Sequence, residues 1–369
     1  MKLDKIIIFY PSFEKGGVTK ILINLLKSEN NKKYNFHIIS SECPLKKKDM
    51  KKNFFFHKIS KKDNSNFIPH RFQTAFRAMI KLNSLVKRLD KNTLVHSMQS
   101  NIAAIIICLL KNTKVVIRNS ENPIFSTLNS ENKFSGIVTF LMKLLFYNFS
   151  NGIITNSKGS AKSLGFFVFN NKKIMQIYNP YLKNINNQKY KKQKIILNIA
   201  RLRKQKDHLT LIKAFKIFSE KNKDYKLVIL GHGNLHKKLL LLVDRLEIKN
   251  RVFFKGWTKD TTPYLKKSKI FVLSSVYEGL GNVLIDAINF DIPCISTDCP
   301  SGPNEILMNG RGGFLVEPKS PQLLSEKMKF CINNYDEALI KNRFAKSKLY
   351  RFMIKQNTNK YFKYLNTFY

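Results

Sequence analysis

The sequence predicts an α/β protein built from two parallel-sheet halves joined by a linker. Short apolar strands alternate with longer amphipathic helical segments, as in a doubly wound parallel sheet. The alternation stops in a polar, lysine-rich stretch from Asn179 to Lys194 and then starts again. With 369 residues, the chain is long enough for two domains of ordinary size.

The first half contains short apolar runs bounded by polar residues, which favour strands, and segments with apolar residues at helical spacing. We expect strands at 5–10, 36–40, 54–57, 93–97, 115–118, 152–156 and 174–178. We expect helices at 18–26, 71–89, 101–110 and 136–149, and Ser157 has the residue type that caps a further helix.

The second half repeats the alternation after the linker. The expected strands are 195–200, 226–230, 251–255, 270–274 and 293–297, and the expected helices are 208–220, 235–246 and 282–289. From about Ser320 the chain is helical, aromatic and basic. Two such halves in succession predict a ligand-binding cleft between them.

The bulk composition indicates a globular, reduced protein. The apolar share is 43%, and apolar runs recur along the chain. The run Ile6 to Tyr10 predicts a first strand rather than a signal peptide, and no apolar stretch reaches the ~20 residues of a membrane-spanning helix. The five cysteines are scattered without a CxxC pair, which favours a cytoplasmic protein without structural zinc.

The net charge of +42 leaves three interpretations open. Residues 1–194 hold 35 Lys/Arg and 9 Asp/Glu (35 − 9 = +26), and residues 195–369 hold 31 and 15 (31 − 15 = +16). The lysines belong to a solvated surface of a Lys- and Asn-rich chain, or they bind anionic lipid headgroups, or they bind nucleic acid. The third ranks last, because no nucleic-acid-binding motif occurs and aromatics do not interleave with the lysines.

Two loops at strand ends have the composition of anion-binding loops. Gly16 and Gly17 follow the first strand, where glycines let backbone N–H groups approach an anion; a tight turn is the alternative. In the second half, Arg201 and Lys206 lie five residues apart on the loop after the strand at 195–200. The planar guanidinium of Arg201 and the compact ammonium of Lys206 would suit a diphosphate; the alternative is that this is a solvated basic loop.

The segment from Tyr277 to Ile306 carries the most specific pattern. Glu278 precedes a glycine-hinged turn that ends at Gly281, and the N–H groups of the following helix start can bind phosphates. Glu278 and Asp286 are eight residues apart, about 12 Å along a helix, so they would contact different parts of one ligand. The helix-start donors are Asn282, Val283 and Leu284, and the turn at Gly231 and Gly233 faces the same edge.

Other chemistries have little support in the sequence. There is no DxD, HExxH or Cys/His cluster, so we expect no metal and no other cofactor. There is also no GxSxG for covalent catalysis. The cations for a diphosphate would then be Arg201 and Lys206.

In this order, these segments resemble glycosyltransferase family 4, the retaining, nucleotide-sugar-dependent transferases with the GT-B fold. The likeness runs over nearly the whole chain. It includes RNSENP at 118–123, TNSKGSAKSL at 155–164, ARLRKQKDHLTLIKAF at 200–215, LVILGHGNLHKKL at 227–239, FFKGW at 253–257 and EGLGNVLIDAINFDIPCISTDCPSGPNEI from Glu278. The ending DCPSGPNEIL is similar to enzymes that add N-acetylhexosamines, notably GalNAc, to polyprenol-linked or surface glycans.

The resemblance implies a role for each matching residue. Arg201 and Lys206 hold the donor's phosphates, and Glu278 contacts the donor sugar and supports the developing oxocarbenium charge. Asp286 takes the place of a glutamate that holds the ribose, and it is one methylene shorter. Met98 takes the usual place of a histidine, so His96 receives no catalytic role.

The resemblance also implies domains: an acceptor-binding domain at 1–180, a linker at 181–194, a nucleotide-sugar-binding domain at 195–345 and a helix at 346–369 that crosses back to the first domain. The predicted reaction transfers a sugar, with retention of its anomeric configuration, to a lipid-linked or surface-glycan acceptor in bacterial polysaccharide synthesis. The sugar that the resemblance favours is an N-acetylhexosamine such as GalNAc, donated by its UDP derivative. We expect the protein at the inner face of the cytoplasmic membrane. A UDP-sugar epimerase and a non-enzymatic basic membrane- or nucleic-acid-binding protein are the alternatives.

Overall fold

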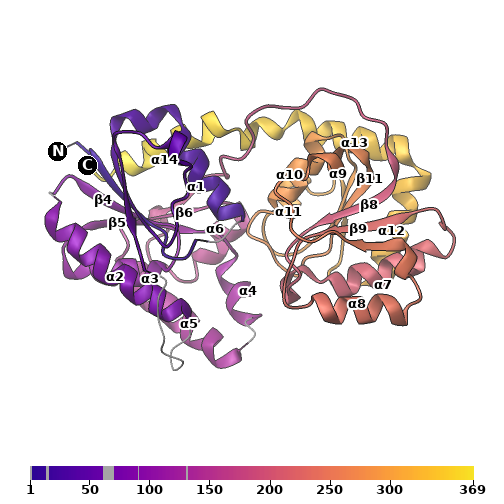
Figure 1. Cartoon of the computed structure of the whole chain (residues 1–369), viewed down its shortest axis with the longest axis horizontal. Coiled ribbons are helices and arrows are strands. Elements are labelled where there is room, and N and C mark those ends of the chain that lie inside the picture. Colours follow the sequence, from indigo (N-terminus) through magenta and orange to yellow (C-terminus); the bar gives the residue numbers. More distant parts are fainter. Residues whose placement is uncertain (1, 14–15, 61–69, 90, 130–131) are drawn as a thin grey trace. The chain divides into compact units, whose positions relative to one another are not determined.

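The chain forms two compact units in this computed structural model, which describes residues 2–13, 16–60, 70–89, 91–129 and 132–369 (Figure 1). Unit 1 comprises the chain up to Lys183 together with Arg351–Tyr369, and unit 2 comprises Asn184–Tyr350. Both units contain a parallel sheet covered by helices, which confirms the predicted α/β class.

Among the described residues, unit 1 contains a parallel sheet in the order β3-β2-β1-β4-β5-β6-β7. The order reverses between β1 and β4, where Ile8 pairs with Ile38 on one side and with His96 on the other. The strands are β1 (Lys5–Phe9), β2 (Asn35–Ser40), β3 (Phe54–Lys58), β4 (Thr93–Ser97), β5 (Lys114–Asn119), β6 (Gly152–Thr155) and β7 (Ile174–Gln176).

Alternate strand residues of unit 1 face two different helical layers. One core contains Ile7, Val95 and Ile117 with residues of α2, α3 and α5. Figure 1 shows these three helices on the side of the sheet away from α1 and α14. The helices of the unit are α1 (Gly17–Lys27), α2 (His70–Arg88), α3 (Asn101–Leu110), α4 (Pro123–Leu128), α5 (Lys133–Phe146), α6 (Lys158–Leu164) and α14 (Ile354–Asn366).

The C-terminal helix α14 belongs to unit 1 although it follows all of unit 2 in the sequence. The Phe362 ring packs against Tyr34 and Phe36 at 5.3 and 6.2 Å between ring centroids. The chain enters this helix through a bridge between Leu182 and Met353, and the Ile354 N–H donates to the Leu182 carbonyl. Leu182 and Met353 lie next to the two places where the chain passes between the units. This backbone pairing therefore joins the two segments of the chain that make up unit 1.

Unit 2 contains, among its described residues, a parallel sheet in the order β10-β9-β8-β11-β12-β13. The strands are β8 (Gln193–Ile199), β9 (Lys226–Leu230), β10 (Val252–Phe254), β11 (Ser268–Leu273), β12 (Cys294–Thr297) and β13 (Phe314–Val316). The helices are α7 (His208–Ser219), α8 (His236–Arg245), α9 (Thr262–Lys267), α10 (Asn282–Asn289), α11 (Pro303–Ile306), α12 (Pro321–Asn333) and α13 (Tyr335–Ser347).

The two faces of this second sheet are covered by different helices. Phe215 of α7, Leu239 of α8 and Met328 of α12 belong to one core with alternate strand residues. Helix α10 lies outside that core and contacts α13, with Asn342 Nδ2 donating to the Ile288 carbonyl at 3.4 Å. The helices that follow β8 and β9 therefore lie on one face and the helix that follows β11 lies on the other, as on the two sides of the strand reversal in a doubly wound sheet.

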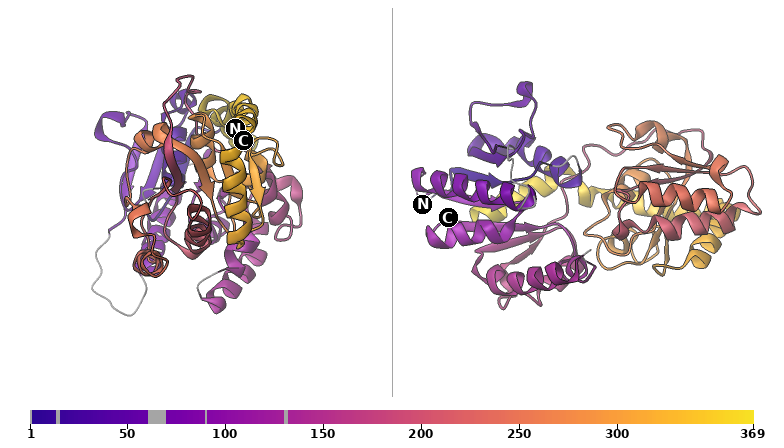
Figure 2. Two further views of the ribbon diagram at one scale, coloured as in Figure 1. Left: turned by 90° about the vertical axis from the view of Figure 1, so that its right-hand side faces the viewer. Right: turned by 60° about the horizontal axis from the view of Figure 1, so that its bottom comes forward.

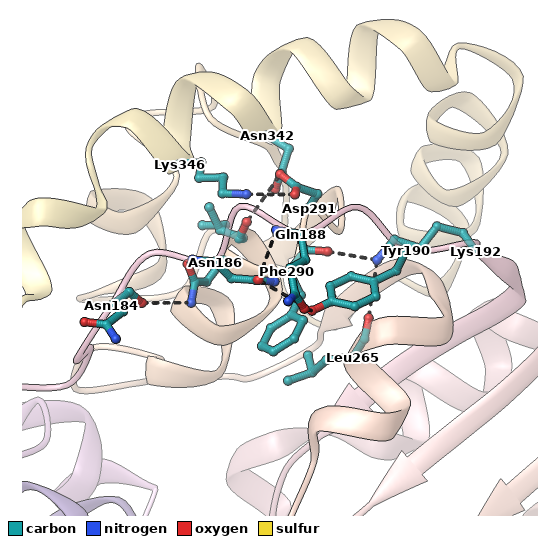
Figure 3. A network of polar contacts seen from close by, with 12 residues as sticks. Asn184, Asn186, Gln188, Tyr190, Lys192, Leu265, Phe290, Asp291, Asn342 and Lys346 are labelled. Atoms are coloured by element: carbon teal, nitrogen blue, oxygen red, sulfur yellow. Dashed lines mark hydrogen bonds and ion pairs between the residues drawn. The ribbon is translucent and has the colours of Figure 1, made fainter.

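The segment expected as a free linker is hydrogen-bonded along unit 2 (Figure 3). The Asn186 N–H donates to Asn289 Oδ1 at 2.9 Å, and Lys192 Nζ donates to the Phe290 carbonyl at 2.8 Å. Burial lowers the pKa of Lys192 to about 8. The side chains are polar because they bind backbone and amide groups there. The chain crosses between the units at Lys183, not across residues 181–194.

Short elements account for most differences from the sequence prediction. Strand β13 and helices α4, α9 and α11 span three to six residues each, too few to show a period. The single helix expected at 346–369 is instead the end of α13, a 3-10 turn at Leu349–Phe352 and α14.

Figure 2 shows the same elements from two further directions, with the helices α2, α3 and α5 forward in its right-hand view.

Candidate active site

The candidate site lies where the strand order of unit 2 reverses. Strands β8 and β11 are neighbours, and Leu197 pairs with Phe271. The loop after β8 carries Arg201 and Lys206, and the loop after β11 carries Glu278. Ligands of doubly wound sheets bind at the carboxyl ends of the strands at such a reversal. The pairing of β8 with β11 therefore brings two of the predicted loops to the usual position of a ligand site.

Lys206 and Glu278 form a direct ion pair at this point. Lys206 Nζ lies 2.5 Å from Glu278 Oε1, and the same oxygen accepts a hydrogen bond from Ser275 Oγ at 2.7 Å. The side chains are only 15% and 8% exposed. A charged pair this deeply buried persists only with well-placed partners. The carboxylate is thus held in one orientation by a cation and a hydroxyl.

Backbone contacts hold the two loops together. The Val276 N–H donates to the Gln205 carbonyl at 2.8 Å, and Gln205 Nε2 donates to the Tyr277 carbonyl at 2.9 Å. Ser274 Oγ donates to the Lys206 carbonyl at 2.8 Å. The positions of both charged groups are therefore set by main-chain geometry rather than by their mutual attraction alone.

A third loop supports the carboxylate from the β12 side. Thr297 Oγ1 donates to the Ser275 carbonyl at 2.5 Å, and the Glu278 N–H donates to the Pro300 carbonyl at 3.4 Å. The buried Cys299 thiol has its pKa raised to about 12, first by burial and then by the charge of Glu278. Cys299 therefore remains a neutral thiol and is not a nucleophile at neutral pH.

His208 is a supporting residue of the basic loop. Its Nε2 lies 3.1 Å from Asn198 Oδ1, and Asn198 Nδ2 donates to the Val272 carbonyl at 2.8 Å. The imidazole is fully buried, and burial followed by the charge of Lys206 lowers its pKa to about 4. A neutral imidazole thus links β8, β11 and the start of α7 beneath the loop.

The glycines at the end of β9 are required by the loop beside them. A Cβ on Gly231, whose φ is +147°, would lie 1.9 Å from the Ala200 carbonyl oxygen. A Cβ on Gly233 would lie 2.3 Å from the Leu202 carbonyl oxygen. The Leu202 N–H also donates to the His232 carbonyl at 2.9 Å. The glycines therefore let the β9 turn pack against the backbone on either side of Arg201.

Helix α10 begins next to Glu278, as the sequence predicts. Gly281 has a φ of +85° at its N-cap, and the Leu284 N–H donates to the Gly281 carbonyl at 2.9 Å. Because that N–H is engaged within the first turn, Leu284 is removed from the set of phosphate donors. Asn282, Val283 and Asp286 are partly exposed along the same helix.

The remaining residues that the sequence singled out, Gly16, Gly17, His96 and Met98, all lie in unit 1. Gly16 and Gly17 are exposed where α1 begins, and Gly16 has an extended φ of −178°. His96 is buried on β4, its Nδ1 lies 3.1 Å from the Val116 carbonyl oxygen, and burial lowers its pKa to about 4. Met98 is also buried, at 4% exposure. His96 therefore lies within the interior of the fold.

Two features of the site were not predicted from the sequence. Ser275 and Asn198 are ordinary strand-end residues, and their roles follow from contacts between distant strands. In the part of the chain that the structure describes, no group of three or more His, Cys, Asp or Glu side chains could hold a metal ion. The charges gathered at this edge are those of Lys206 and Glu278, with Arg201 on the same loop.

This fold and its candidate site define a class: a two-unit α/β protein with a buried ion pair at the strand reversal of its second sheet. Residues 183–347 match the model of the family described as "Glycosyl transferases group 1". The chain is 33% identical over 264 residues to the uncharacterised glycosyltransferase MJ1059 of Methanocaldococcus jannaschii, a match that covers 63% of this chain and 64% of that protein.

Two further comparisons extend over more of the chain. It is 29% identical over 340 residues, 90% of this chain and 91% of the relative, to N-acetylgalactosamine-N,N'-diacetylbacillosaminyl-diphospho-undecaprenol 4-alpha-N-acetylgalactosaminyltransferase of Campylobacter jejuni. The crystal structure of Anabaena Alr3699/HepE in complex with UDP-glucose superposes with a TM-score of 0.79 over 98% of this chain and 99% of that chain, at 17% identity. The chain therefore has the GT-B fold, and residues 183–347, which make up most of unit 2, are similar to the group 1 glycosyl transferases.

Proposed function

We propose that the protein transfers a sugar from a UDP-sugar to a hydroxyl of a lipid-linked or surface-glycan acceptor, with retention of configuration at the sugar. One observation carries this proposal: a buried carboxylate and a cation, Glu278 and Lys206, meet at the strand reversal of unit 2. A nucleotide sugar needs a cation for its diphosphate and an oriented acceptor group for its sugar hydroxyls. In the ion pair, Lys206 supplies the cation for the diphosphate and Glu278 supplies the oriented acceptor group for the sugar hydroxyls.

In this proposal the two loops divide the donor between them. Arg201 and Lys206 bind the diphosphate, and the N–H groups of Asn282 and Val283 at the start of α10 add dipole and hydrogen bonds. Glu278 accepts from the sugar hydroxyls, and Asp286 lies further along α10 toward the ribose. Before the donor binds, Lys206 neutralises Glu278, which keeps the carboxylate in place without an unpaired buried charge.

The reaction follows from these positions. The bond between the anomeric carbon and the diphosphate breaks while the acceptor oxygen forms a new bond on the same face of the sugar. The leaving diphosphate takes the electron pair, and its growing charge is stabilised by Arg201, Lys206 and the helix start. The acceptor proton passes to the departing phosphate oxygen. No metal is needed in this scheme, because the chain supplies the positive charge.

The sugar and the acceptor are proposed from the relatives. The Campylobacter jejuni relative is named for GalNAc transfer to an undecaprenol-linked glycan. A second Campylobacter jejuni relative, 30% identical over 156 residues, is also named as a GalNAc transferase on such an acceptor. We therefore propose UDP-GalNAc as the donor and a polyprenol-diphosphate-linked glycan as the acceptor, bound by unit 1.

A lipid-linked acceptor is found at a membrane surface. No helix within the described residues is long and apolar enough to cross a bilayer. The net charge of +42 would attract the chain to anionic headgroups, at about 1 kcal/mol per nearby Lys or Arg. We propose that the protein works as a peripheral protein at the inner face of the cytoplasmic membrane.

The test of this function compares Lys206→Ala with Lys204→Ala, which changes an exposed lysine on the same loop. UDP- and GDP-sugars are incubated with each protein, with and without a polyprenol-linked acceptor, and the products are weighed. We expect acceptor-dependent transfer from UDP-GalNAc, reduced about 100-fold or more by Lys206→Ala because the leaving diphosphate loses a cation. Lys204→Ala should retain the wild-type rate.

Three outcomes of that experiment would contradict the proposal. Near-normal turnover of Lys206→Ala, with Trp257 fluorescence showing that unit 2 is folded, would refute the diphosphate role of the lysine. An altered UDP-sugar released without acceptor would indicate an epimerase. No product and no UDP binding with any donor would indicate a non-enzymatic protein.

A further inference from the structure

Helix α5 (Lys133–Phe146) is apolar on its exposed side as well as on its buried side. Of its two lysines, Lys133 is exposed at the start of the helix, and Lys143 is buried, with Nζ donating to the Pro123 carbonyl at 3.3 Å. Burial lowers the pKa of this lysine to about 8. Phe140, Leu144 and Phe146 pack against the core of unit 1, whereas five further apolar side chains of the helix are exposed by between 42% and 75%: Phe134, Ile137, Val138, Leu141 and Leu145.

The five exposed residues form one continuous stripe, which we call the α5 stripe. At about 100° per residue, they lie within an arc of roughly 100°, and Lys143 lies on the opposite side of the helix. Single exposed apolar residues are ordinary, but a contiguous apolar face on a soluble domain indicates an interaction site. The α5 stripe is therefore a surface with a partner.

Helix α2 of the same helical layer also has exposed apolar side chains. Phe76 and Ile80 of α2 are 62% and 57% exposed, four residues apart on one helical face. A largely apolar cavity of about 830 Å³ lies between α2, α3 and α5, with Phe76, Ile106 and Lys143 among its lining residues. On α5 this cavity is lined by Thr139 and Lys143, on the side of the helix away from the α5 stripe, so the exposed residues of α2 and of α5 share only the helical layer, the one shown away from α14 in Figure 1.

The charge around this surface is predominantly positive, although Glu121 lies near Lys143. Helices α2, α3, α4, α5 and α6 contain no Asp or Glu, whereas α2 alone carries Arg77, Lys81, Lys87 and Arg88. Residues 91–183 hold 11 Lys/Arg and 2 Asp/Glu (11 − 2 = +9). The partner must therefore offer an apolar interior beneath a negatively charged surface. An anionic lipid bilayer has this composition.

A second copy of the chain does not offer an apolar interior beneath a negatively charged surface. Two copies meeting through their α5 stripes would bring acid-free, lysine- and arginine-bearing helices together, and like charges across an interface oppose association. In a bilayer, the same cations lie at the anionic headgroup level while the apolar residues enter the acyl boundary.

We propose that the α5 stripe is the surface by which unit 1 docks on an anionic bilayer. This inference rests on the proposed membrane-bound acceptor and names the face that contacts the lipid. Docking this face places the helical layer in the interface plane without any membrane-spanning segment.

The test uses the double variant Ile137→Gln/Leu141→Gln. Both residues are exposed, at 60% and 57%, and glutamine retains helix propensity, so the fold should be unchanged. The matched control is Leu241→Gln/Ile340→Gln, which changes residues of unit 2 that are 68% and 63% exposed. Binding is measured by co-sedimentation with phosphatidylglycerol and phosphatidylcholine vesicles at low and high salt.

We expect the wild type and the control to bind phosphatidylglycerol vesicles, with binding weakened by salt. The α5 variant should bind at least about tenfold more weakly, because each large aliphatic side chain withdrawn from the lipid costs that order of affinity. Equal binding by the variant and the control would overturn the proposal. Equal binding of the wild type to both lipids would also overturn it. So would light scattering that showed a dimer of the wild type and a monomer of the α5 variant.

The same variant separates this inference from the proposed function. If the proposed function holds, the α5 variant should still bind UDP and transfer sugar to a short-chain, detergent-soluble acceptor at the wild-type rate. Loss of vesicle binding together with retained soluble transfer supports the docking surface. Absence of transfer by the wild type itself would refute the proposed function, while the vesicle result would still decide the docking surface.

Discussion

Single residues in unit 2 show how the site is kept in a defined charge state. Lys206 and Glu278 neutralise one another, so neither charge is buried alone. His208 lies below the same loop as a neutral imidazole, with Nε2 against Asn198 Oδ1. Its Nδ1 is buried and has no hydrogen-bond partner among the described residues, so nothing there stabilises a second proton. The burial that fixes the loop also makes it sensitive to acid.

We predict that unit 2 loses stability in acid partly through His208. The pKa of this imidazole is lowered from 6.5 to about 4 in the folded chain. The unfolded chain therefore binds more protons between those values, and stability is full above pH 6.5 and falls as the pH approaches 4. His208→Gln should reduce the slope of unfolding free energy against pH by one proton, about 1.4 kcal/mol per pH unit.

This slope is measured by urea unfolding at several pH values, followed by the fluorescence of Trp257, the single tryptophan, which lies in unit 2. His232→Gln, at an exposed position of the same unit, is the control. An unchanged slope in His208→Gln would show that proton uptake by this imidazole does not destabilise the fold.

Among the elements, the loops after β8 and β9 fit together through backbone rather than side chains. A Cβ on Gly231 or Gly233 would overlap a carbonyl group of residues 200–202. Such contacts leave no flexible atoms to move aside. The loop that carries Arg201 can therefore lie close to the loop after β9 because Gly231 and Gly233 have no side chains.

We predict that Gly233→Ala destabilises unit 2 by about 1–3 kcal/mol, as other overpacked positions do. The added Cβ would lie 2.3 Å from the Leu202 carbonyl oxygen, so the loop must shift. Guanidinium unfolding followed by Trp257 fluorescence measures the loss, and calorimetry measures the accompanying loss of UDP affinity.

Gly16→Ala provides the comparison for that substitution. Gly16 has an extended φ of −178°, and a Cβ there would meet nothing within 4 Å. Its effect on stability should stay within about 0.5 kcal/mol. If Gly233→Ala were equally mild, the tight packing of the two loops would not be what positions Arg201.

In the chain as a whole, unit 1 is closed by residues from both ends of the sequence. Tyr361, Phe362 and Leu365 of α14 are buried at 1%, 4% and 2% exposure. Asn366 Nδ2 donates to Tyr34 Oη at 2.6 Å, across 332 residues of sequence. The C-terminal helix is thus part of the core of unit 1, and that unit is complete only after unit 2 has been made.

We predict that Phe362→Ala destabilises unit 1 by about 3–5 kcal/mol, the usual cost of truncating a buried aromatic residue. Far-UV circular dichroism follows both units during urea unfolding, whereas Trp257 fluorescence follows unit 2. The dichroism transition should therefore shift to lower urea by more than the fluorescence transition.

The matched control for this truncation is Phe169→Ala. Phe169 lies in unit 1 and is 94% exposed, so its removal should change stability by no more than about 0.5 kcal/mol. A loss as small as this in Phe362→Ala would mean that α14 is not needed for the core of unit 1.

The sequence by itself determined the succession of strands and helices and the loops that carry the site. Local periodicity and turn residues sufficed, because a strand or helix depends mainly on its own residues. Helices at 101–110 and 282–289 were predicted with the bounds that the structure has. Glu278 was selected as an acid beside a glycine-hinged turn, and Arg201 and Lys206 as two cations on a strand-end loop that suit a diphosphate.

Only the tertiary structure decided which of these residues meet. Lys206 and Glu278 are 72 residues apart, and their contact depends on the pairing of β8 with β11, which no local pattern specifies. The sequence likewise showed an apolar helix around Lys143 without showing which face is covered. Burial is decided by neighbours distant in sequence, and here they enclose the lysine and leave the α5 stripe exposed.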